Sequence, residues 1–362
     1  MILKKFFLYA VVFTLIATIS GVVAFVVTRH FSPQAQKEVV QSDGVSAVPT
    51  ANCVREGRQD FACYKIFYTD LVQKSGVKIA FDDLKVRYAS TPAVKNGCHQ
   101  ITHVLGRAGA DLAGGVGSAF ALGDAMCWSG YYHGVMEEVL KGIGVAELPA
   151  KLNTICSAVP GKDTYSFNYY NCVHGLGHGI MQLYSDDVMA SLDVCSKLDG
   201  DWEKSSCGGG VFMENIMVED RGGISMYLKK EDPIYPCNAV PDIHKSQCYL
   251  MQTSHMLTAF HEDFTKVFAT CDTVEEKYRG TCFESAGRDA SGRSVSDKLQ
   301  TTATCMLGKN AFAQEHCVIG AVKDFVSFFH SDTQAKDFCN GLSPNLKTVC
   351  LTVADSYYAS FQ

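Results

Sequence analysis

The chain has 362 residues and a formal net charge of −6, from 32 Lys and Arg against 38 Asp and Glu. This acidic balance and the lack of a Lys- or Arg-rich run argue against a nucleic-acid partner bound through its phosphates. The 16 cysteines are unusual in number, but they include neither the C-x2-C pairs of common zinc sites nor the C-x-x-C-H motif of c-type haem.

An uncharged apolar run follows Lys4 and Lys5 and extends over residues 6–27. A helix that rises about 1.5 Å per residue over this run crosses a hydrocarbon core of about 30 Å. No small-x-small cleavage site follows the run, so residues 1–28 are predicted to form an uncleaved transmembrane signal anchor. The two lysines place the N-terminus in the cytoplasm by the positive-inside rule. We therefore predict a single-pass membrane protein with a periplasmic or extracellular body.

The segment after the predicted anchor, residues 29–50, is polar and contains Pro, Gly and Ser, which predicts a flexible linker. All 16 cysteines lie beyond this linker, in residues 51–362. Disulfides persist outside the cytoplasm, so we expect these cysteines to be paired in an extracytoplasmic domain. The membrane is an expected partner through the N-terminal helix, and a protein or peptide partner is a further expectation.

The cysteines follow a regular spacing. The first cysteines of the last four pairs, at positions 237, 271, 305 and 339, are 34 residues apart, and each is followed by a second cysteine 11 or 12 residues later. A period of this length is typical of a helix–turn–helix repeat. Cys98 and Cys127 lack a partner at this spacing, so they are predicted to pair with each other. The predicted disulfides are Cys53–Cys63, Cys98–Cys127, Cys156–Cys172, Cys195–Cys207, Cys237–Cys248, Cys271–Cys282, Cys305–Cys317 and Cys339–Cys350.

Each repeat is predicted to form a helical hairpin, because amphipathic segments flank short connectors that contain turn residues. The first helix is expected to end near the first cysteine and the second helix to begin at the second cysteine. Each disulfide then closes a short loop and contributes about 2–3 kcal/mol. The predicted fold is an all-α, disulfide-stapled solenoid of about eight helical hairpins. Stacking of the tetratricopeptide or Sel1 type is an architectural analogy only, because the W-x2-L-G-x2-Y and A-x3-F patterns are missing.

The densest motif is N-C-V-H-G-L-G-H-G-I-M, over residues 171–181. In a helix, His174 and His178 lie one turn apart on one face. The same holds for His99 with His103 and for His133 with Glu137. The alternating glycines at 175, 177 and 179 each cost about 1 kcal/mol in a helix relative to alanine. Close packing of neighbouring helices is the favoured explanation for these glycines, and the approach of a ligand to the backbone is the alternative.

Equivalent positions of successive repeats line one surface of a solenoid, so His103, His133 and His178 are expected to lie side by side. Imidazoles one turn apart on a helix chelate transition ions, which predicts a site for Zn, Cu or Fe. Glu214 and Glu138 are candidates for carboxylates that orient the ligands or act as a base. The predicted metal ligands are His99, His103, His133, Glu137, His174, His178 and Met213.

Three functions remain open from the sequence. The leading hypothesis is an extracytoplasmic binding protein that carries a His-rich metal site on a concave face. The first alternative is a metal-dependent hydrolase or oxidoreductase, in which Glu137 or Glu138 acts as the base. The second alternative is a structural envelope scaffold, in which the buried histidines satisfy the backbone and bind no metal.

Overall fold

The computed structural model describes residues 53–55, 58–220, 223–294 and 297–360. These residues are helical apart from turns and one short antiparallel ladder between β1 (Val54–Arg55) and β2 (Arg58–Gln59). Residues Ala51–Gln362 form one compact unit. The predicted anchor (1–28) and linker (29–50) lie outside the described residues. Within the described ranges, no helix combines the length and the apolar character needed to cross a membrane.

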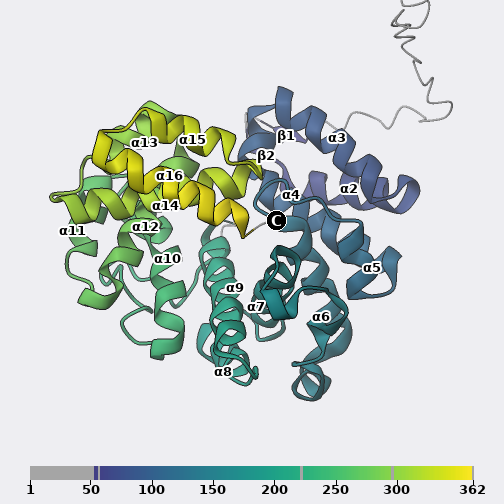
Figure 1. The fold of residues 1–362 in the computed structure, drawn as a ribbon. Helices are drawn as coiled ribbons and strands as arrows, with labels where there is room; N and C mark the ends of the chain where they lie inside the picture. Colours follow the sequence, from purple (N-terminus) through teal and green to yellow (C-terminus); the bar gives the residue numbers. More distant parts are fainter. Residues whose placement is uncertain (1–52, 56–57, 221–222, 295–296, 361–362) are drawn as a thin grey trace, which may run out of the picture. The chain divides into compact units, whose positions relative to one another are not determined.

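Long helices recur along the chain and alternate for the most part with shorter ones (Figure 1). The long helices are α2 (Phe61–Ser75), α4 (Pro92–Ala113), α6 (Gly130–Lys151), α7 (Phe167–Leu183), α9 (Asp201–Asp220), α10 (Asp242–Ala259), α12 (Glu276–Arg293), α14 (Ala311–Phe329) and α16 (Pro344–Ala359). The other helices are α3 (Val77–Ser90), α5 (Val116–Ala121), α8 (Val188–Cys195), α11 (Phe264–Cys271), α13 (Lys298–Cys305) and α15 (Thr333–Asn340). Two 3-10 turns, Ile155–Ala158 and Lys162–Thr164, lie between α6 and α7.

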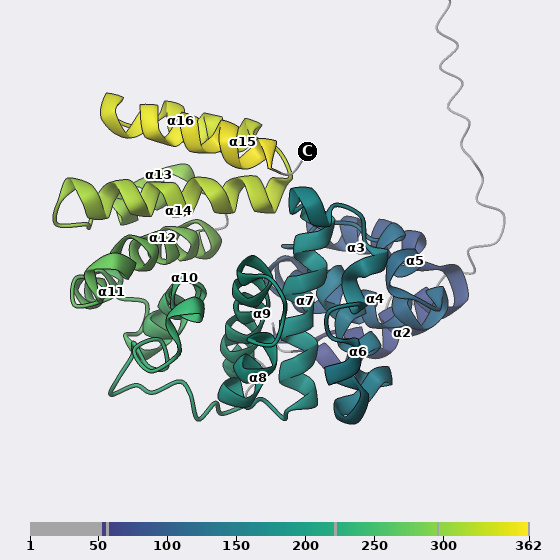
Figure 2. The ribbon, with the colours of Figure 1, turned by 60° about the horizontal axis from the view of Figure 1, so that its bottom comes forward.

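Each long helix packs chiefly against the next long helix along the chain, in the order α2, α4, α6, α7, α9, α10, α12, α14 and α16. Figure 2 shows α10, α12, α14 and α16 as successive layers, with α9, α7, α6 and α4 following one another on the other side. The other helices pack against the long helix that precedes or follows them. The long helices therefore form a continuous series of packed neighbours.

The starts of several helices are encoded by capping residues. Asp187, Asp263 and Asp297 precede α8, α11 and α13, and each carboxylate accepts a hydrogen bond from a backbone N–H of the first turn. Ser166 and Asn310 cap α7 and α14 in the same way. Such caps satisfy donors that have no partner within the helix and contribute about 1 kcal/mol each.

All eight disulfides predicted from the spacing are confirmed, with Cα–Cα distances of 5.3–5.9 Å. Four of them tie the end of a short helix to the second turn of the following long helix, as Cys195 at the end of α8 is tied to Cys207 in α9. Cys98 in α4 is bonded to Cys127 in the turn before α6.

Two details of the predicted hairpins are wrong. Most of the second helices begin five or six residues before the second cysteine, as α9 begins at Asp201, because residues of the connector form the first turn. Residues 223–241, which contain Cys237, form turns and bends instead of the expected first helix. Prolines at 233, 236 and 241 explain this difference, because proline lacks an N–H donor and clashes with a preceding helical turn.

Glycines bring neighbouring long helices into backbone contact. A Cβ on Gly134 of α6 would overlap with the carbonyl oxygen of His103 on α4. On the next pair of helices, a Cβ on Gly177 would overlap with the carbonyl of Cys207, and one on Gly210 with that of His174. The expected close packing is therefore present, and it holds the helices that carry the histidines at the shortest approach a backbone allows.

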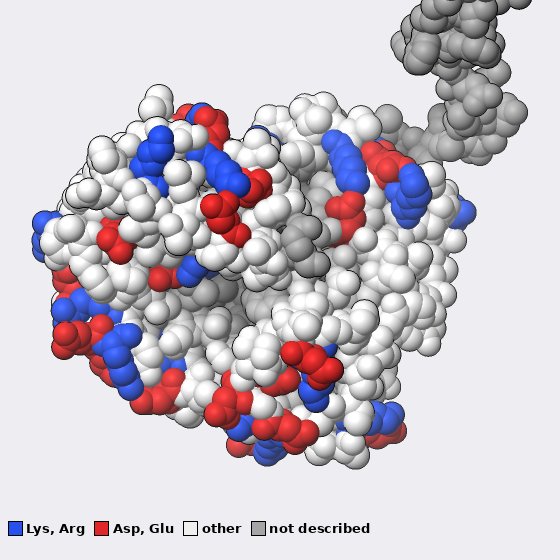
Figure 3. Space-filling view, viewed as in Figure 1, with Lys and Arg blue, Asp and Glu red and all other residues white. Residues whose placement is uncertain are grey.

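Helix α14 returns to the N-terminal half of the unit (Figure 1). The indole Nε1–H of Trp128 donates to Oδ1 of Asp324 at 2.9 Å, and the rings of Trp128 and Phe328 have centroids 4.6 Å apart. His330, just after α14, stands edge-on to Phe167 of α7 at 5.1 Å. In the same view the surface is hollowed near its centre (Figure 3).

Candidate metal centre

Five histidines converge where α4, α6 and α7 pack in succession. Centroids of the rings in contact are 4.4–5.5 Å apart, and the ring of His133 lies against all four others. Four of the side chains are at most 3 % exposed, and only His99 keeps some exposed surface. The five residues are His99 and His103 on α4, His133 on α6, and His174 and His178 on α7.

The two imidazoles of α4 are each fixed through Nδ1. His99 Nδ1 lies 2.8 Å from the carbonyl oxygen of Cys127, and His103 Nδ1 lies 2.6 Å from Oε1 of Glu137 on α6. The Nε2 atoms of the two rings face each other at 3.2 Å. An imidazole whose Nδ1–H is bound by an oxygen offers Nε2 as a metal ligand, and this arrangement is the usual one around metal-binding histidines.

The carboxylate of Glu137 is fully buried and uses both of its oxygens. Oε1 accepts from His103, and Oε2 accepts from a guanidinium nitrogen of Arg107, one turn along α4 from His103. Burial alone would raise the pKa of Glu137, but the hydrogen bond from His103 and the charge of Arg107 outweigh it and hold this pKa below its ordinary value. Glu137 is therefore an anion that orients His103.

The protons available to the α4 pair do not satisfy its four ring nitrogens. The carbonyl of Cys127 and the ionised Glu137 only accept, so both Nδ1 atoms must donate. Two neutral imidazoles carry one N–H each, and both are then used at Nδ1. Two Nε2 lone pairs remain facing each other at 3.2 Å, which is repulsive unless a cation lies between them. The cation is either a third proton or a metal ion.

Burial of the two imidazoles disfavours a third proton between His99 and His103. Desolvation, followed by the neighbouring His103, lowers the pKa of His99 to about 3. Burial also lowers the pKa of His103, against the opposing effect of Glu137. At neutral pH, both rings of the pair are therefore uncharged, and their facing Nε2 atoms are compatible with metal binding.

The same arrangement recurs one helix pair further along the chain. His178 Nδ1 lies 2.8 Å from Oε2 of Glu214 on α9, and His178 Nε2 faces His174 Nε2 at 3.4 Å. The Tyr170 hydroxyl lies 3.4 Å from His174 Nδ1 and its ring stacks on that imidazole, with centroids 5.3 Å apart. Burial, followed by the proximity of His178, lowers the pKa of His174 well below its ordinary value.

His133 lies between the two histidine pairs, and one of its ring nitrogens forms no hydrogen bond. Its side chain is 2 % exposed, and Nδ1 is buried without a hydrogen-bond partner. Burial and the four surrounding histidines lower the pKa of His133 well below its ordinary value, so the ring is neutral. A buried nitrogen without a partner costs about 1–3 kcal/mol unless a ligand uses it.

Ligand atoms of these residues lie within 4.8 Å of one another in three triads: His99, His103 and His133; His133, His174 and His178; and His103, Glu137 and His178. Two imidazole nitrogens on one tetrahedral ion, at metal–nitrogen distances of 2.0–2.1 Å, are about 3.3–3.4 Å apart, whereas neighbouring ligands of a square-planar ion are about 2.9 Å apart. The observed separations of 3.2 and 3.4 Å fit the tetrahedral value better.

Six of the seven predicted metal ligands are thus brought together, and the seventh is not. Met213 is half-buried, and no contact of the described residues joins its sulfur to an imidazole, so its role stays a prediction. Glu214, the next residue, holds His178. Glu138 instead forms an ion pair with Lys141 at the surface. Sequence reasoning missed Arg107, although its position one turn after His103 on α4 places it on the face that carries the histidines.

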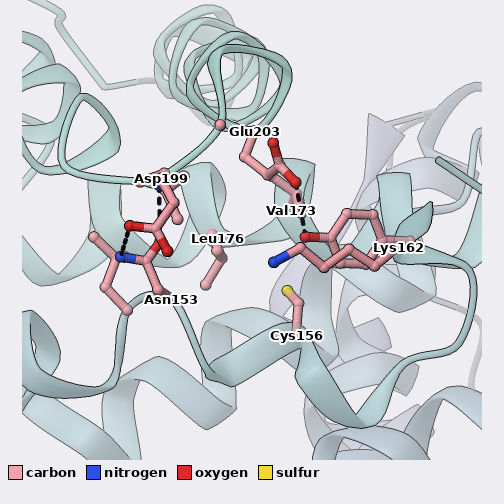
Figure 4. Close-up of a pocket in the computed structure, with 11 residues that line it drawn as sticks. Asn153, Cys156, Lys162, Val173, Leu176, Asp199 and Glu203 are labelled. Atoms are coloured by element: carbon pink, nitrogen blue, oxygen red, sulfur yellow. Dashed lines mark hydrogen bonds between the residues drawn. The ribbon is translucent and has the colours of Figure 1, made fainter.

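A small cavity in the described part of the chain is separate from this centre. It is lined by residues of the α6–α7 connection, α7 and the start of α9, and its ≈ 20 Å³ is room for about one water molecule. Figure 4 shows Asn153 and Asp199 at one side of it and Glu203 and Lys162 at the other. None of the five histidines lines this cavity, so it gives a substrate no path to them.

Comparisons of the chain with protein-family models, with curated proteins and with solved structures find no match.

Proposed function

We propose that the protein binds a transition-metal ion of the zinc type through its histidine cluster, His99, His103, His133, His174 and His178. The observation that carries this proposal is the facing pair of Nε2 atoms of His99 and His103, at 3.2 Å, with both Nδ1 atoms already committed to acceptors. The spacing suits tetrahedral coordination, and the buried Nδ1 of His133 supplies a further ligand without a competing partner.

The proposed role is metal binding rather than catalysis. Glu137, the base considered for an enzyme, accepts from His103 and Arg107 and has a lowered pKa, so it acts as an anion that orients His103. The histidines are buried, and the described cavity does not reach them.

We further propose that the helical hairpins form a repeat solenoid in an extracytoplasmic, membrane-anchored protein. The succession of contacts between long helices and the 34-residue cysteine spacing support the solenoid. Eight disulfides support an oxidising compartment. The hydropathy of residues 6–27 supports the anchor. Binding of a protein or peptide on a concave face stays a prediction.

The test is zinc binding by the full chain, produced in an oxidising compartment and stripped with a chelator. Zinc retained after gel filtration is measured by elemental analysis, beside a His99→Ala/His103→Ala variant and a His261→Ala control whose imidazole lies outside the cluster. We expect zinc in the wild type and the control, a marked loss in the double variant, and a rise in the unfolding temperature with zinc. No zinc in the wild type, or equal zinc in all three, overturns the proposal.

A further inference from the structure

The histidine cluster contains one chelating unit twice. In the first unit, α4 carries His99 and His103 one turn apart, and Glu137 of the next long helix binds Nδ1 of the second histidine at 2.6 Å. In the second unit, α7 carries His174 and His178 one turn apart. Glu214 of the next long helix again binds Nδ1 of the second histidine, at 2.8 Å. Two histidines and the carboxylate that holds one of them therefore recur together, as a complete arrangement of ligands.

The geometry of each unit fits one ion. The Nε2 atoms are 3.2 Å apart in the first unit and 3.4 Å apart in the second. The ring centroids are 4.8 and 5.2 Å apart. For two imidazoles on a tetrahedral ion, the metal–nitrogen bond and the ring radius together place the centroids about 5.2 Å apart. Each pair thus spans one edge of a coordination tetrahedron without any movement of its helix.

His133 completes the first unit better than the second. Its ring stands at 69° to His99 and 76° to His103, with centroids 5.3 Å from both. Against His178 it lies nearly parallel, at 15° and 4.4 Å. Nitrogen lone pairs lie in the plane of the ring, so two stacked imidazoles cannot both direct a lone pair at one ion. His133 therefore belongs with His99 and His103.

One ion cannot serve both units. The triads of ligand atoms that lie within 4.8 Å of one another contain at most one complete histidine pair, and the two triads that contain a pair share only His133. The rings of His103 and His178, which belong to different units, have centroids 5.5 Å apart. Four ligands of a tetrahedral ion must all lie within about 3.4 Å of one another, and the four Nε2 atoms are not grouped in this way.

We propose that the cluster binds two transition ions in neighbouring sites, one held by His99, His103 and His133, and the other by His174 and His178. This inference rests on the proposed metal-binding function. The second ion has two protein ligands against three for the first, so it binds more weakly and exchanges more readily. The Tyr170 hydroxyl, which can accept as well as donate, lets His174 carry its proton on Nδ1 and offer Nε2 to the second ion.

The experiment is a zinc titration of the full chain by isothermal calorimetry, with the stoichiometry checked by elemental analysis. A His99→Ala/His103→Ala variant removes the first site, a His174→Ala/His178→Ala variant removes the second, and a His261→Ala/His316→Ala variant is the matched control. We expect two ions with different dissociation constants in the wild type and the control. The first variant should bind one ion with the weaker constant, and the second should bind one ion with the tighter constant.

The outcomes separate this inference from the function on which it rests. One ion in the wild type that is lost in both variants overturns the inference and leaves the metal-binding function standing. No ion in the wild type overturns both. Electron paramagnetic resonance of the copper(II)-loaded wild type gives a second readout that needs no variant. Two neighbouring ions are expected to show a half-field transition, and the spectrum of one isolated ion contradicts the inference.

Discussion

Replacing Gly134 with alanine should push apart the two helices that carry His99, His103 and His133. A Cβ at this position on α6 would overlap with the carbonyl oxygen of His103 and stand 2.7 Å from its carbonyl carbon. Ordinary carbon–carbon contacts lie at about 3.5–4.0 Å, so α4 and α6 would have to separate by about 1 Å. The opposing atoms belong to the backbone of a packed helix, and no side chain can rotate away to make room.

The expected free-energy change is the difference between two effects. Alanine is a better helix former than glycine by about 1 kcal/mol. Overpacking of a filled interior costs about 1–3 kcal/mol, and a backbone overlap belongs at the upper end of that range. We therefore expect Gly134→Ala to lower the free energy of unfolding by about 2 kcal/mol. Gly142→Ala, on the same helix with nothing within 4 Å of the added Cβ, should raise it by up to about 1 kcal/mol.

The same displacement should weaken metal binding, because His103 and His133 lie on the two helices that separate. Metal–nitrogen bonds tolerate only about ±0.2 Å, so a shift of about 1 Å removes a ligand from the shell. Urea unfolding followed by circular dichroism gives the stability, and calorimetric zinc titration gives the affinity. A Gly134→Ala protein with the stability and zinc affinity of Gly142→Ala would refute the close-packing argument.

Three further predictions follow from the contacts around the cluster. Glu137→Gln keeps an oxygen for His103 but loses the anion, so zinc affinity in a calorimetric titration should fall about 10–100-fold. A Cys98→Ser/Cys127→Ser variant should lose about 3–4 kcal/mol in urea unfolding by the loop-entropy relation, and should also bind zinc more weakly because the Cys127 carbonyl orients His99. Burial raises the pKa of Asp324 from 3.8 to about 6, so the folded protein keeps a proton that the unfolded chain loses. Stability should therefore fall by about 3 kcal/mol as pH rises from about 4 to about 6, and Asp324→Asn should remove this contribution.

Each of these predictions has an outcome that contradicts it. Unchanged zinc affinity in Glu137→Gln would mean that its carboxylate does not orient His103. A Cys98→Ser/Cys127→Ser protein that loses stability but binds zinc with wild-type affinity would show that this disulfide does not position the histidines. Cys339→Ser/Cys350→Ser is the control, and it is expected to lose stability and to keep wild-type zinc affinity. A difference in stability between Asp324→Asn and the wild type that is constant from pH 4 to pH 6 would show that Asp324 titrates normally.

The cysteine framework was predictable because spacing records it directly. Seven pairs show a second cysteine 10–16 residues after the first, and the last four of them repeat every 34 residues. The remaining pair, Cys98–Cys127, follows by elimination. The helix starts were less accessible, because polar residues of the connectors, such as Asp201, form the first turn of the long helices. The intrinsic preferences of such short polar segments allow both a turn and the first turn of a helix, and the packing of the long helices decides between the two.

The site was predictable only in part. One-turn spacing placed His99 with His103 and His174 with His178, and repeat equivalence placed His133 between them. What the sequence could not show is which atoms of neighbouring helices meet: Glu214 holding His178, or Arg107 holding Glu137. These contacts depend on helix separation and rotation, which the glycine contacts set. The contacts with neighbouring helices determine that Nδ1 of His103 and of His178 is hydrogen-bonded and that Nε2 stays available to a metal. Residue spacing alone does not show which ring nitrogen is available.

X-ray absorption at the zinc edge of the zinc-loaded full chain tests the central claim most directly, because it reports the atoms bonded to the ion. We predict a first shell of nitrogen ligands at about 2.0–2.1 Å, with the outer scattering of several imidazole rings and no sulfur at about 2.3 Å. A shell of oxygens without imidazole scattering would place the ion elsewhere, on surface carboxylates or in water, and would contradict the histidine centre.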